Sequence, residues 1–596
     1  MLEPPDDVRF DIRGVLGERL QANIRNWLLV APDANPGMLE VFRDRDRLPR
    51  RDLVPWAGEF PGKYLTSAVK ALQLAHDPAL EAHLRRFVPA LIAAQDAEGY
   101  LGPFPQAARL MEPGLWDIWG HYHCMLGLYL WHLETGDQAA LDACFKAADL
   151  LCRIFLDGDK RVVQAGSEEM NESVIHILCL LHRRTGQRRY LQLAREIEKD
   201  WEVPPSGDYV RQVLAGKEFY EGPKPRWEGL HGIQAIAELH YITGEDQYRR
   251  AYEHIWWSIA RGDRHNTGGF SSGEQATGNP YDPRAIETCC TIAWMALTVD
   301  MLRLTGNPLV ADELELSTFN AVLGAQNPSG RWWTYNTPMD GDRKASAHEI
   351  VFQARAGAPE LNCCSVNGPR GLGMLADWAL MASDKGLFLN YYGPCQLSAR
   401  IPRMHQVVRL DQETDYPRSN RIRLTVTPEA RLPFALNLRI PRWSARTQIS
   451  VAGSPLPAPP PGEYLKIERQ WQPGDVVEVA LDFAPHAWVG ERECEGKASI
   501  YRGPILLAYD PRFDRYSADQ VPLLDLGKLV LCETAWTEAP SPLLLAQVIS
   551  AEGQPVTLCD FASAGLGGTR YISWLPARGL PPSPFTRDNP LRTKQV

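Results

Sequence analysis

Apolar residues at helical spacing fill the first two thirds of the chain, and a short polar turn interrupts them repeatedly. The turn consists of Thr, Gly and a polar residue, and it occurs at residues 135–137, 185–187, 243–245 and 305–307. Apolar residues recur every two to four positions on both sides of it. A glycine that ends one helix and a polar residue that caps the next are typical of two antiparallel helices joined by a tight turn. The pattern therefore predicts a series of helical hairpins.

Two further hairpins complete the series. Residues 72–95 repeat the pattern around the turn at 76–78, and the apolar segment 371–383 is expected to form a helix that pairs with residues 17–30. Each hairpin buries its faces only against neighbouring hairpins, so six of them favour a closed double ring of helices, an (α/α)6 toroid. An open solenoid of the same hairpins is the alternative.

The hydrophobic pattern changes near residue 384. Beyond it, short runs of alternating apolar and polar residues are separated by Pro and Gly clusters, as at 421–428 and 475–483. Alternation with frequent turns predicts antiparallel strands, and many such strands predict one or two β-sandwiches. We therefore expect an (α/α)6 barrel over residues 1–383, followed by antiparallel β-sandwich domains over residues 384–596.

Composition and charge exclude several classes of partner. The 596 residues are 44% hydrophobic and 23% charged, with a formal net charge of −10. Because no basic field exists to attract phosphates or anionic lipids, nucleic acid and membrane surfaces are poor partners. The N-terminal residues have no apolar core of secretory type, and no run approaches the roughly 18 apolar residues of a membrane-spanning helix. A cytoplasmic location is expected, where grouped cysteines are typical of metal or catalytic sites.

Two pairs of adjacent cysteines stand at the starts of predicted helices. Cys289 begins one pair, two residues after Glu287, and Cys363 and Cys364 form the other. A helix N-terminus favours a thiolate, and an extended lead-in lets Glu287 and Cys289 reach one point. If the two segments are neighbours in the ring, a carboxylate and thiolates suitable for zinc converge there. A purely structural zinc site, or buried cysteines without a function, would show the same spacing.

A glycine-rich segment and three histidines are candidates for a sugar site. The segment 266–282 contains Glu274, which is a candidate general acid, although a solvated loop glutamate would look the same. His121, His123 and His231 lie near predicted helix starts among aromatic residues. Aromatic residues with a few polar groups are typical of a sugar pocket, but capping or core histidines would show a similar pattern.

An ordered set of motifs resembles a known family. The motifs are GGFSSGE, ETC, WTYNTP, NCCSVN, SDKGLFLNYYG, LRIPRW and YRGPILLAY. In this order, over roughly residues 60–510, they resemble the β-L-arabinofuranosidases of glycoside hydrolase family 127. The resemblance implies a catalytic (α/α)6 barrel followed by β-sandwich domains. It also implies a retaining mechanism in which a zinc-bound cysteine attacks the anomeric carbon of the sugar.

The resemblance also implies roles for individual residues. The implied zinc ligands are Glu287, Cys289, Cys363 and Cys364. Cys363 matches the nucleophile and Glu274 the acid/base residue, while Tyr335 and His231 match sugar-contacting positions. His121 is an approximate match, because GHYHC stands here where HELYC is common in the family.

Three departures from the family pattern bear on the sugar. Ser167 stands where a sugar-contacting histidine is often found, Cys290 is an additional thiol, and CCSVN replaces the commoner CCPPN. These changes leave the implied zinc site and nucleophile intact, but they alter the sugar pocket. The reaction type therefore follows from the resemblance more directly than the identity of the sugar.

The expected function is that of an exo-acting retaining hydrolase that releases a terminal furanose, β-L-arabinofuranose, from plant-type glycans or oligosaccharides. Hydrolysis of a different sugar is one alternative. A polysaccharide lyase or a sugar epimerase on the same toroid is a second. A carbohydrate-binding protein with a structural zinc is a third. By analogy with the family, a homodimer formed through a β-domain is a further expectation.

Overall fold

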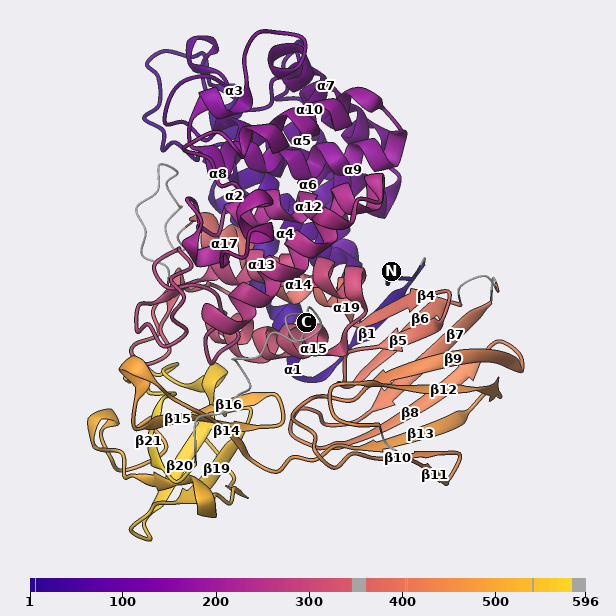
Figure 1. Ribbon diagram of the computed structural model, residues 1–596, viewed down its shortest axis with the longest axis vertical. Coiled ribbons are helices and arrows are strands. Elements are labelled where there is room, and N and C mark those ends of the chain that lie inside the picture. The colour runs from indigo at the N-terminus through magenta and orange to yellow at the C-terminus, as the bar shows by residue number, and fades with distance from the viewer. Residues whose placement is uncertain are drawn as a thin grey trace.

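The protein folds into a helical body and two β-sheet bodies (Figure 1). The computed structural model describes residues 1–580 apart from 6, 346–360, 402–403, 405, 458 and 539–540. In Figure 1 the helices occupy the upper body, the orange strands form one sheet body and the yellow strands form the other. The order of helices first and strands afterwards agrees with the change of hydrophobic period near residue 384.

Five helical hairpins follow the predicted pattern. Their bounds are α4 Phe60–Ala75 with α5 Pro78–Ile92, α6 Asp117–Thr135 with α7 Gln138–Phe155, α9 Ile175–Thr185 with α10 Arg188–Asp200, α12 Gly229–Thr243 with α13 Asp246–Gly262, and α14 Thr288–Thr305 with α15 Pro308–Leu316. Each Thr-Gly turn ends its first helix with the glycine in the left-handed region, as at Gly136 with φ 74°. Glycine adopts this conformation without steric cost, so the local sequence determines where these helices end.

The inner helices form a closed ring. Around it, α4 contacts α6, α6 contacts α9, α9 contacts α12, and α12 contacts α14. The short helices α17 Cys363–Asn367 and α18 Pro369–Gly373 contact both α14 and α4 and so close the ring. The fold is therefore the predicted (α/α)6 toroid, and the open solenoid is wrong. The N-terminal helix α1 Gly14–Asn23, which continues as the π-helix η1 Ile24–Leu28, contacts α18 and α4 from outside.

The helix predicted over residues 371–383 is wrong at its C-terminal end. Helix α19 ends at Trp378, and residues 380–383 form strand β4, which pairs with β5. Ala382 of this strand also pairs with Glu3 from the chain's start. An apolar run of this length suits a buried strand as well as a helix, and the strand partners decide between them.

The first β-body contains two stacked sheets (Figure 1). One has the order β1-β6-β7-β8-β13-β10-β11, with bounds Arg9–Ile12, Cys395–Arg400, Val407–Glu413, Arg421–Pro428, Asp475–Ala480, Gln448–Val451 and Ser454–Leu456. The other has the order β12-β9-β5-β4, with bounds Tyr464–Trp471, Leu432–Arg439, Gly386–Leu389 and Leu380–Ser383. Strands such as β8 alternate exposed and buried residues, as expected for a sandwich.

The second β-body contains one sheet with the order β17-β21-β15-β16-β20-β19-β18 and with β14 paired to β15. The bounds are Leu524–Asp525, Leu575–Arg578, Lys497–Arg502, Ile505–Ala508, Pro555–Asp560, Leu545–Ile549, Cys532–Glu533 and, for β14, His486–Val489. Strand β1 comes from the first residues of the chain and pairs with β6. The first sheet body therefore contains residues from both sides of the predicted boundary between 383 and 384. The domain boundary at 383/384 stays a prediction.

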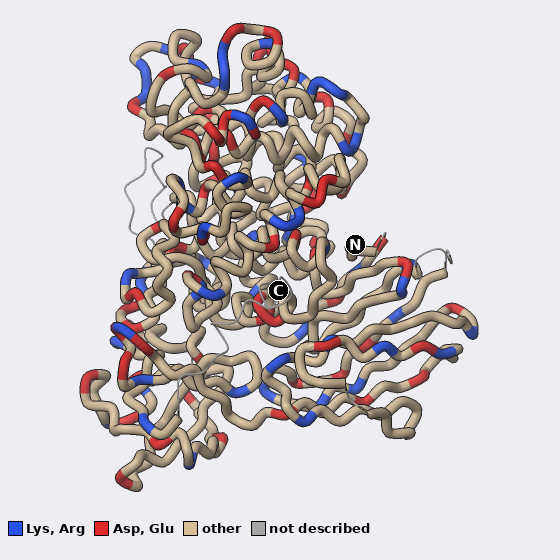
Figure 2. The backbone as a smooth tube through the Cα atoms, in the orientation of Figure 1, with Lys and Arg blue, Asp and Glu red and all other residues tan. Residues whose placement is uncertain are grey.

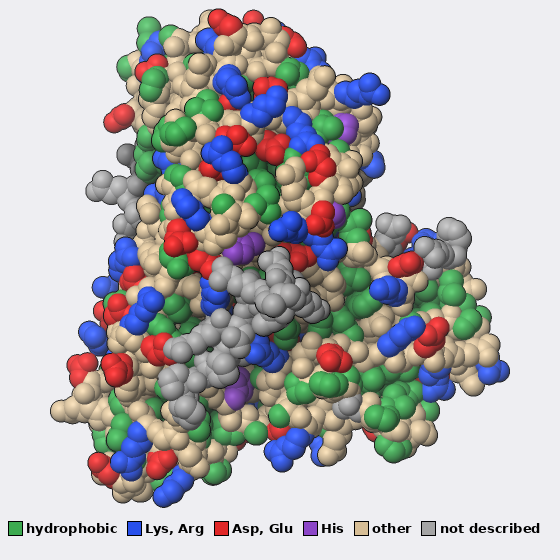
Figure 3. Space-filling view, in the orientation of Figure 1, with side chains coloured by type: hydrophobic (Ala, Val, Ile, Leu, Met, Phe, Trp, Pro, Cys, Tyr) green, Lys and Arg blue, Asp and Glu red, His purple; other side chains and the backbone are tan. Residues whose placement is uncertain are grey.

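Charge is mixed over the surface. Figure 2 shows acidic and basic residues interspersed along the three bodies, and the face in Figure 3 shows the same mixture. Among the helices that the structure describes, none has both the length and the apolar character needed to cross a membrane.

A buried arginine links the first β-body to the barrel, and its loss is expected to destabilise the protein. Arg439 of β9 is 0% exposed, donates to Glu315 of α15 at 2.6 Å and pairs with Asp312. Arg439→Met leaves these two buried carboxylates without their cation, so the free energy of unfolding should fall by about 3–5 kcal/mol. Urea unfolding measures the change. Arg423→Met, which removes exposed surface pairs, is the control and should cost less than about 1 kcal/mol; equal effects of the two variants would contradict the prediction.

Candidate functional site

One carboxylate and three thiols from two distant segments come together at the starts of two helices of the barrel. Glu287, Cys289, Cys363 and Cys364 each offer a ligand atom, and these atoms all lie within 4.8 Å of one another. Glu287 ends the short strand β2 Ile286–Glu287, which pairs with β3 Asn336–Thr337, and Cys289 lies in the first turn of α14. Cys363 begins α17, whose N-terminus is capped by Asn362. The convergence predicted from the two cysteine pairs is therefore present.

The geometry and charge of this cluster suit a divalent metal ion. The Cys363 and Cys364 sulfurs are 3.9 Å apart, and their thiols donate to Glu287 Oε1 at 3.8 and 3.4 Å. A tetrahedral zinc ion with Zn–S bonds of about 2.3 Å separates its sulfur ligands by about 3.8 Å. Three thiols and a carboxylate are also a donor set that zinc accepts. The residues present therefore fit a zinc ion.

The ionisation of the cluster supports the same conclusion. Burial, together with the charge of Cys363, raises the pKa of Glu287 well above its ordinary value, and burial also raises the pKa of Cys364. Burial disfavours the Cys289 thiolate as well, but hydrogen bonds from Cys363 and Cys364 outweigh it and lower the pKa of Cys289. Deprotonation of one of these four buried groups thus makes deprotonation of its neighbours less favourable. A bound divalent cation would hold all of them deprotonated.

A cavity of about 330 Å³ lies beside the cluster. It is lined by Trp56, Glu59, Trp116, Arg226, Trp227, Glu228, Glu274, Glu287, Tyr335, Asn362 and Cys363. Cys289 and Cys364 are fully buried, whereas Cys363 is partly exposed and is the thiol of the cluster that lines the cavity. Cys363 is therefore the sulfur of this group that a ligand in the cavity can reach.

Glu274 is held on the cavity wall by three contacts. Arg226 donates to Glu274 Oε2 at 2.7 Å, and the Tyr335 hydroxyl donates to Oε1 at 3.3 Å. The backbone N–H of Trp227 donates to the Glu274 carbonyl at 3.3 Å, and Glu274 adopts φ 70° in the left-handed region. Such a backbone conformation is rare for a residue with a side chain and persists where the surroundings hold it. Glu274 and Tyr335 thus lie in the cavity with Cys363.

Arg226 is itself fixed by a buried carboxylate. Its guanidinium donates two hydrogen bonds to Glu228, at 2.8 and 2.7 Å, and Glu228 is 1% exposed. Burial raises the pKa of Glu228 to about 7 in spite of this pair. The bidentate contact fixes the plane of the guanidinium, and the second N–H of Nη2 points at Glu274. Sequence reasoning missed both residues, although they flank the Trp227 of the RWEGLHG segment.

Glu59, which lines the cavity, belongs to a buried ion pair. Lys63 and Glu59 lie one turn apart on α4 and its N-cap, with Nζ and Oε2 2.9 Å apart and both side chains about 1–2% exposed. Trp119 also donates to Glu59, and the Lys63 ammonium lies over the Trp119 and Trp227 rings at 5.3 and 5.0 Å. Burial raises the pKa of Glu59 to about 7. A charged pair at i and i+4 within an otherwise apolar helix was the signal that could have identified these residues.

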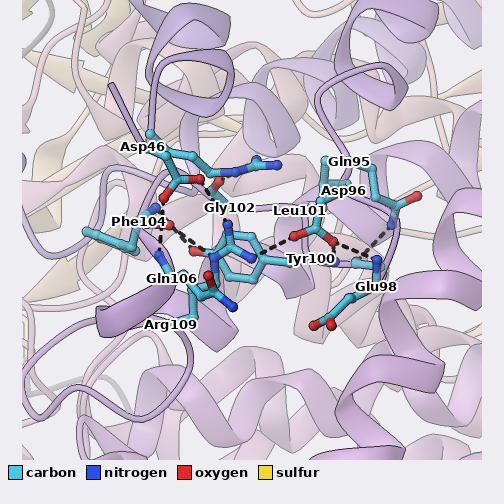
Figure 4. Close-up of polar contacts among 12 residues, drawn as sticks. Asp46, Gln95, Asp96, Glu98, Tyr100, Leu101, Gly102, Phe104, Gln106 and Arg109 are labelled. Carbon is cyan, nitrogen blue, oxygen red and sulfur yellow. Dashed lines mark hydrogen bonds and ion pairs between the residues drawn. The ribbon is translucent and has the colours of Figure 1, made fainter. Parts of the chain in front are cut away.

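His121 does not reach the cavity. The backbone N–H of Leu101 donates to its Nε2 at 3.0 Å, and its Nδ1 lies 2.9 Å from the Asp117 carbonyl oxygen. The loop that carries Leu101 is held by Asp96 and Arg109, which are 2.6 Å apart (Figure 4). Both ring nitrogens are therefore satisfied by the fold, and His121 holds a loop instead of lining the cavity.

His231 lies behind the cavity wall. It is 0% exposed, its Nδ1 lies 3.0 Å from the Tyr122 hydroxyl, and its ring packs against Trp119 and Trp227. Burial lowers its pKa well below the ordinary value, so the ring is neutral at physiological pH. His123 packs edge-on against the same Trp119 ring. Of the predicted sugar contacts Tyr335, His231 and His121, Tyr335 lies in the cavity and His231 adjoins it.

Two of the three departures from the family pattern, Cys290 and Ser167, differ in their relation to the cluster and the cavity. Cys290 is buried, and its thiol donates to Glu287 Oε2 at 3.6 Å, so the extra thiol supports the carboxylate of the cluster. Ser167 is the N-cap of α8 Glu168–Asn171 and is not among the residues that line the cavity.

A second cavity, of about 290 Å³, lies between α15 and the two β-bodies. Its charged groups are engaged with one another, as in the pair of Arg264 with Glu313 at 2.8 Å. None of the residues predicted for the site lines it. The cavity beside Cys363 is therefore the candidate active site.

Family models match both the helical body and the first β-body. The family model for the β-L-arabinofuranosidase GH127 catalytic domain matches residues 12–377, and the model for the GH127 middle domain matches residues 386–483. A non-reducing end β-L-arabinofuranosidase of Bifidobacterium longum subsp. longum is 23% identical over 511 residues, which are 77% of this chain and 75% of that protein.

Solved structures share the whole fold. A GH127 β-L-arabinofuranosidase from Geobacillus stearothermophilus T6 superposes with a TM-score of 0.79 and 20% identity, over 96% of this chain and 100% of that one. A second structure, described as a GH127 β-arabinofuranosidase, also gives a TM-score of 0.79, with 22% identity over 97% of this chain and 98% of the other. The barrel and the sheet bodies thus occur together in these proteins.

Proposed function

The chain belongs to the β-L-arabinofuranosidase family GH127 and is a glycoside hydrolase, and on this premise we propose that it is a retaining, exo-acting enzyme that releases terminal β-L-arabinofuranose from glycans or oligosaccharides. The observation that carries the proposal is the presence of the Cys363 thiol and the Glu274 carboxylate in one cavity beside the Glu/Cys cluster. Of the alternatives considered for the sequence, hydrolysis of another terminal sugar is the one that the family leaves open. The cytoplasmic location and the homodimer stay predictions.

In the first chemical step the Cys363 sulfur attacks the anomeric carbon. A C–S bond forms while the bond from the anomeric carbon to the glycosidic oxygen breaks, and Glu274 transfers its proton to that oxygen. The weaker of the two side-chain contacts of Glu274 is the one at Oε1, where Tyr335 donates at 3.3 Å. The glycosidic oxygen takes the place of this contact, while Arg226 continues to hold Oε2.

In the second step water replaces the sulfur. Glu274, now a carboxylate, removes a proton from water, whose oxygen attacks the anomeric carbon as the C–S bond breaks and the thiolate is restored. Two displacements at the same carbon retain its configuration. Arg226, neutralised by its two contacts with Glu228, supplies orientation to Glu274 without leaving an unpaired charge in the cavity.

Glu287, Cys289, Cys363 and Cys364 are the proposed ligands of a zinc ion. When bound, zinc keeps the Cys363 thiol deprotonated at neutral pH and so supplies a nucleophile without a separate base.

The purified protein is expected to contain about one zinc ion per chain, because four converging acidic donors form a complete tetrahedral set. Cys289→Ser removes one of the buried thiols and should lower the bound zinc to a small fraction of that value. Elemental analysis of extensively dialysed protein measures this. Cys532→Ser, which changes an exposed thiol outside the cluster, is the matched control. Equal zinc contents in Cys289→Ser and in the parent protein would refute the ligand set.

The proposed sugar is tested with a panel of nitrophenyl glycosides that includes both anomers of L-arabinofuranose and the common pyranoses. Release of nitrophenol should be fastest from β-L-arabinofuranoside, and the sugar first released should have the β configuration by NMR. Turnover confined to another glycoside would overturn the choice of sugar but not the reaction type. Release of the α anomer would overturn retention.

A further inference from the structure

Two tryptophans line the outer part of the catalytic cavity. Trp56 and Trp116 are each half-buried, whereas Trp227 and Glu59 in the same lining are 3% and 1% exposed. The difference in exposure places the first pair toward the mouth and the second pair toward the floor. Nothing in the proposed chemistry of Cys363 and Glu274 uses the first pair.

The ring of helices brings these two side chains together. Trp56 lies just before α4, and Trp116 is the N-cap of the neighbouring helix α6. The backbone N–H of Trp116 donates to the Pro55 carbonyl at 3.0 Å, so the segments that lead into the two helices are joined directly. The indole centroids are 5.3 Å apart with an angle of 45° between the ring planes. The two indoles therefore pack against one another and form one apolar surface at the mouth.

The direction of the reaction indicates what lies against this surface. An exo-acting enzyme takes the terminal sugar toward the reacting sulfur, so the leaving group projects toward the mouth of the cavity. The C–H groups on one face of a sugar ring pack favourably against aromatic faces, and flat indoles accept such rings with little loss of conformational entropy. An alkyl leaving group offers far less surface to two inclined rings.

The charged side chains Arg226 and Glu59 of the cavity lining are paired. Arg226 is bound to Glu228 and Glu274, and Glu59 is bound to Lys63. Arg226 is the cation among the described lining residues, and its pairing with two carboxylates leaves no cation there for an anionic leaving group. A neutral ring therefore fits the lining better.

We propose that Trp56 and Trp116 form the subsite for a neutral sugar ring on the leaving-group side of the scissile bond. The inference rests on the proposed glycosidase function and names the class of leaving group that the enzyme takes.

The test compares two substrates that share their terminal sugar, methyl β-L-arabinofuranoside and a disaccharide in which β-L-arabinofuranose is linked to a second neutral sugar. Trp56→Ala and Trp116→Ala should each lower kcat/KM for the disaccharide by about 10-fold or more and should change kcat/KM for the methyl glycoside by less than about 3-fold. Trp56→Phe and Trp116→Phe keep an aromatic face and should restore most of the activity on the disaccharide. Steady-state kinetics on the full-length protein provides all of these values.

The control is Trp443→Ala, which removes a half-buried tryptophan from the second cavity and should affect both substrates equally little. Equal losses on both substrates in the Trp56 and Trp116 variants, or no loss on either, would overturn the subsite while leaving the glycosidase assignment intact. Absence of turnover by the parent protein on the whole glycoside panel would overturn the proposed function and this inference with it.

Discussion

Cys363→Ser is expected to lower kcat/KM for the best nitrophenyl glycoside by about 10⁴-fold or more, because a serine hydroxyl in this position has neither the acidity nor the nucleophilicity of the thiol. Cys363 is the thiol of the Glu/Cys cluster that lines the cavity, and the other two are fully buried, so no neighbouring sulfur can substitute for it. Initial rates with the nitrophenyl panel measure the loss.

The proposed role of Cys363 in attack must be separated from its proposed role as a zinc ligand. Zinc analysis of Cys363→Ser shows whether the metal is retained, and Cys395→Ser changes a buried thiol of the first β-body as a control. Wild-type protein quenched during turnover of a slow substrate should carry one pentosyl group on the peptide that contains Cys363. Full hydrolysis by Cys363→Ser would exclude the thiolate mechanism for this chain, and an adduct on another residue would assign the attack elsewhere.

Glu274→Gln is expected to lower kcat/KM by about 10²–10⁴-fold for substrates with a poor leaving group, since an amide can neither donate nor accept the required proton. Zinc content should be unchanged, because Glu274 is outside the cluster of ligand atoms. For nitrophenyl glycosides the loss should be smaller in the first step, because nitrophenolate departs with little help from an acid.

Azide provides the decisive control for Glu274. It attacks the anomeric carbon without needing a general base, so millimolar azide should accelerate Glu274→Gln on a nitrophenyl glycoside and yield a glycosyl azide of the same configuration as the substrate. Wild-type protein should show no comparable acceleration. Normal hydrolysis by Glu274→Gln of substrates with poor leaving groups would assign the acid/base role to another residue, of which Glu228 is the nearest carboxylate bound to the same arginine.

Local sequence was sufficient for most of the helical body. A Thr-Gly turn such as that at Gly136 ends a helix by itself, because its left-handed conformation is accessible to glycine wherever the rest of the chain lies. The segment 380–383 shows the limit of such reasoning. Its apolar residues satisfy a helix and a buried strand equally, and pairing with Gly386–Leu389 makes it a strand. The secondary structure of such a segment is determined by its tertiary contacts and not by its local preference.

The Glu/Cys cluster was predictable because its members occur in two compact motifs. Glu287 and Cys289 lie at the start of one helix, Cys363 and Cys364 at the start of another, and the toroid places these two helix starts side by side. The same reasoning failed for His121, whose aromatic neighbours resemble a sugar site. Its ring nitrogens contact backbone groups of Leu101 and Asp117, and hydrogen bonds of this kind cannot be recognised from the sequence.

The sequence by itself determined the helical repeat, the change from helices to strands and the four acidic side chains that meet at the barrel. Only the tertiary structure decided which groups surround the reacting atoms. Glu59 precedes α4, whereas Arg226 and Glu228 precede α12, and these side chains share one cavity because the ring curves back on itself. Periodicity records which face of a helix is buried, whereas the direction of a side chain at the start of a helix depends on the neighbouring hairpins, so the pocket could be built only from the folded ring.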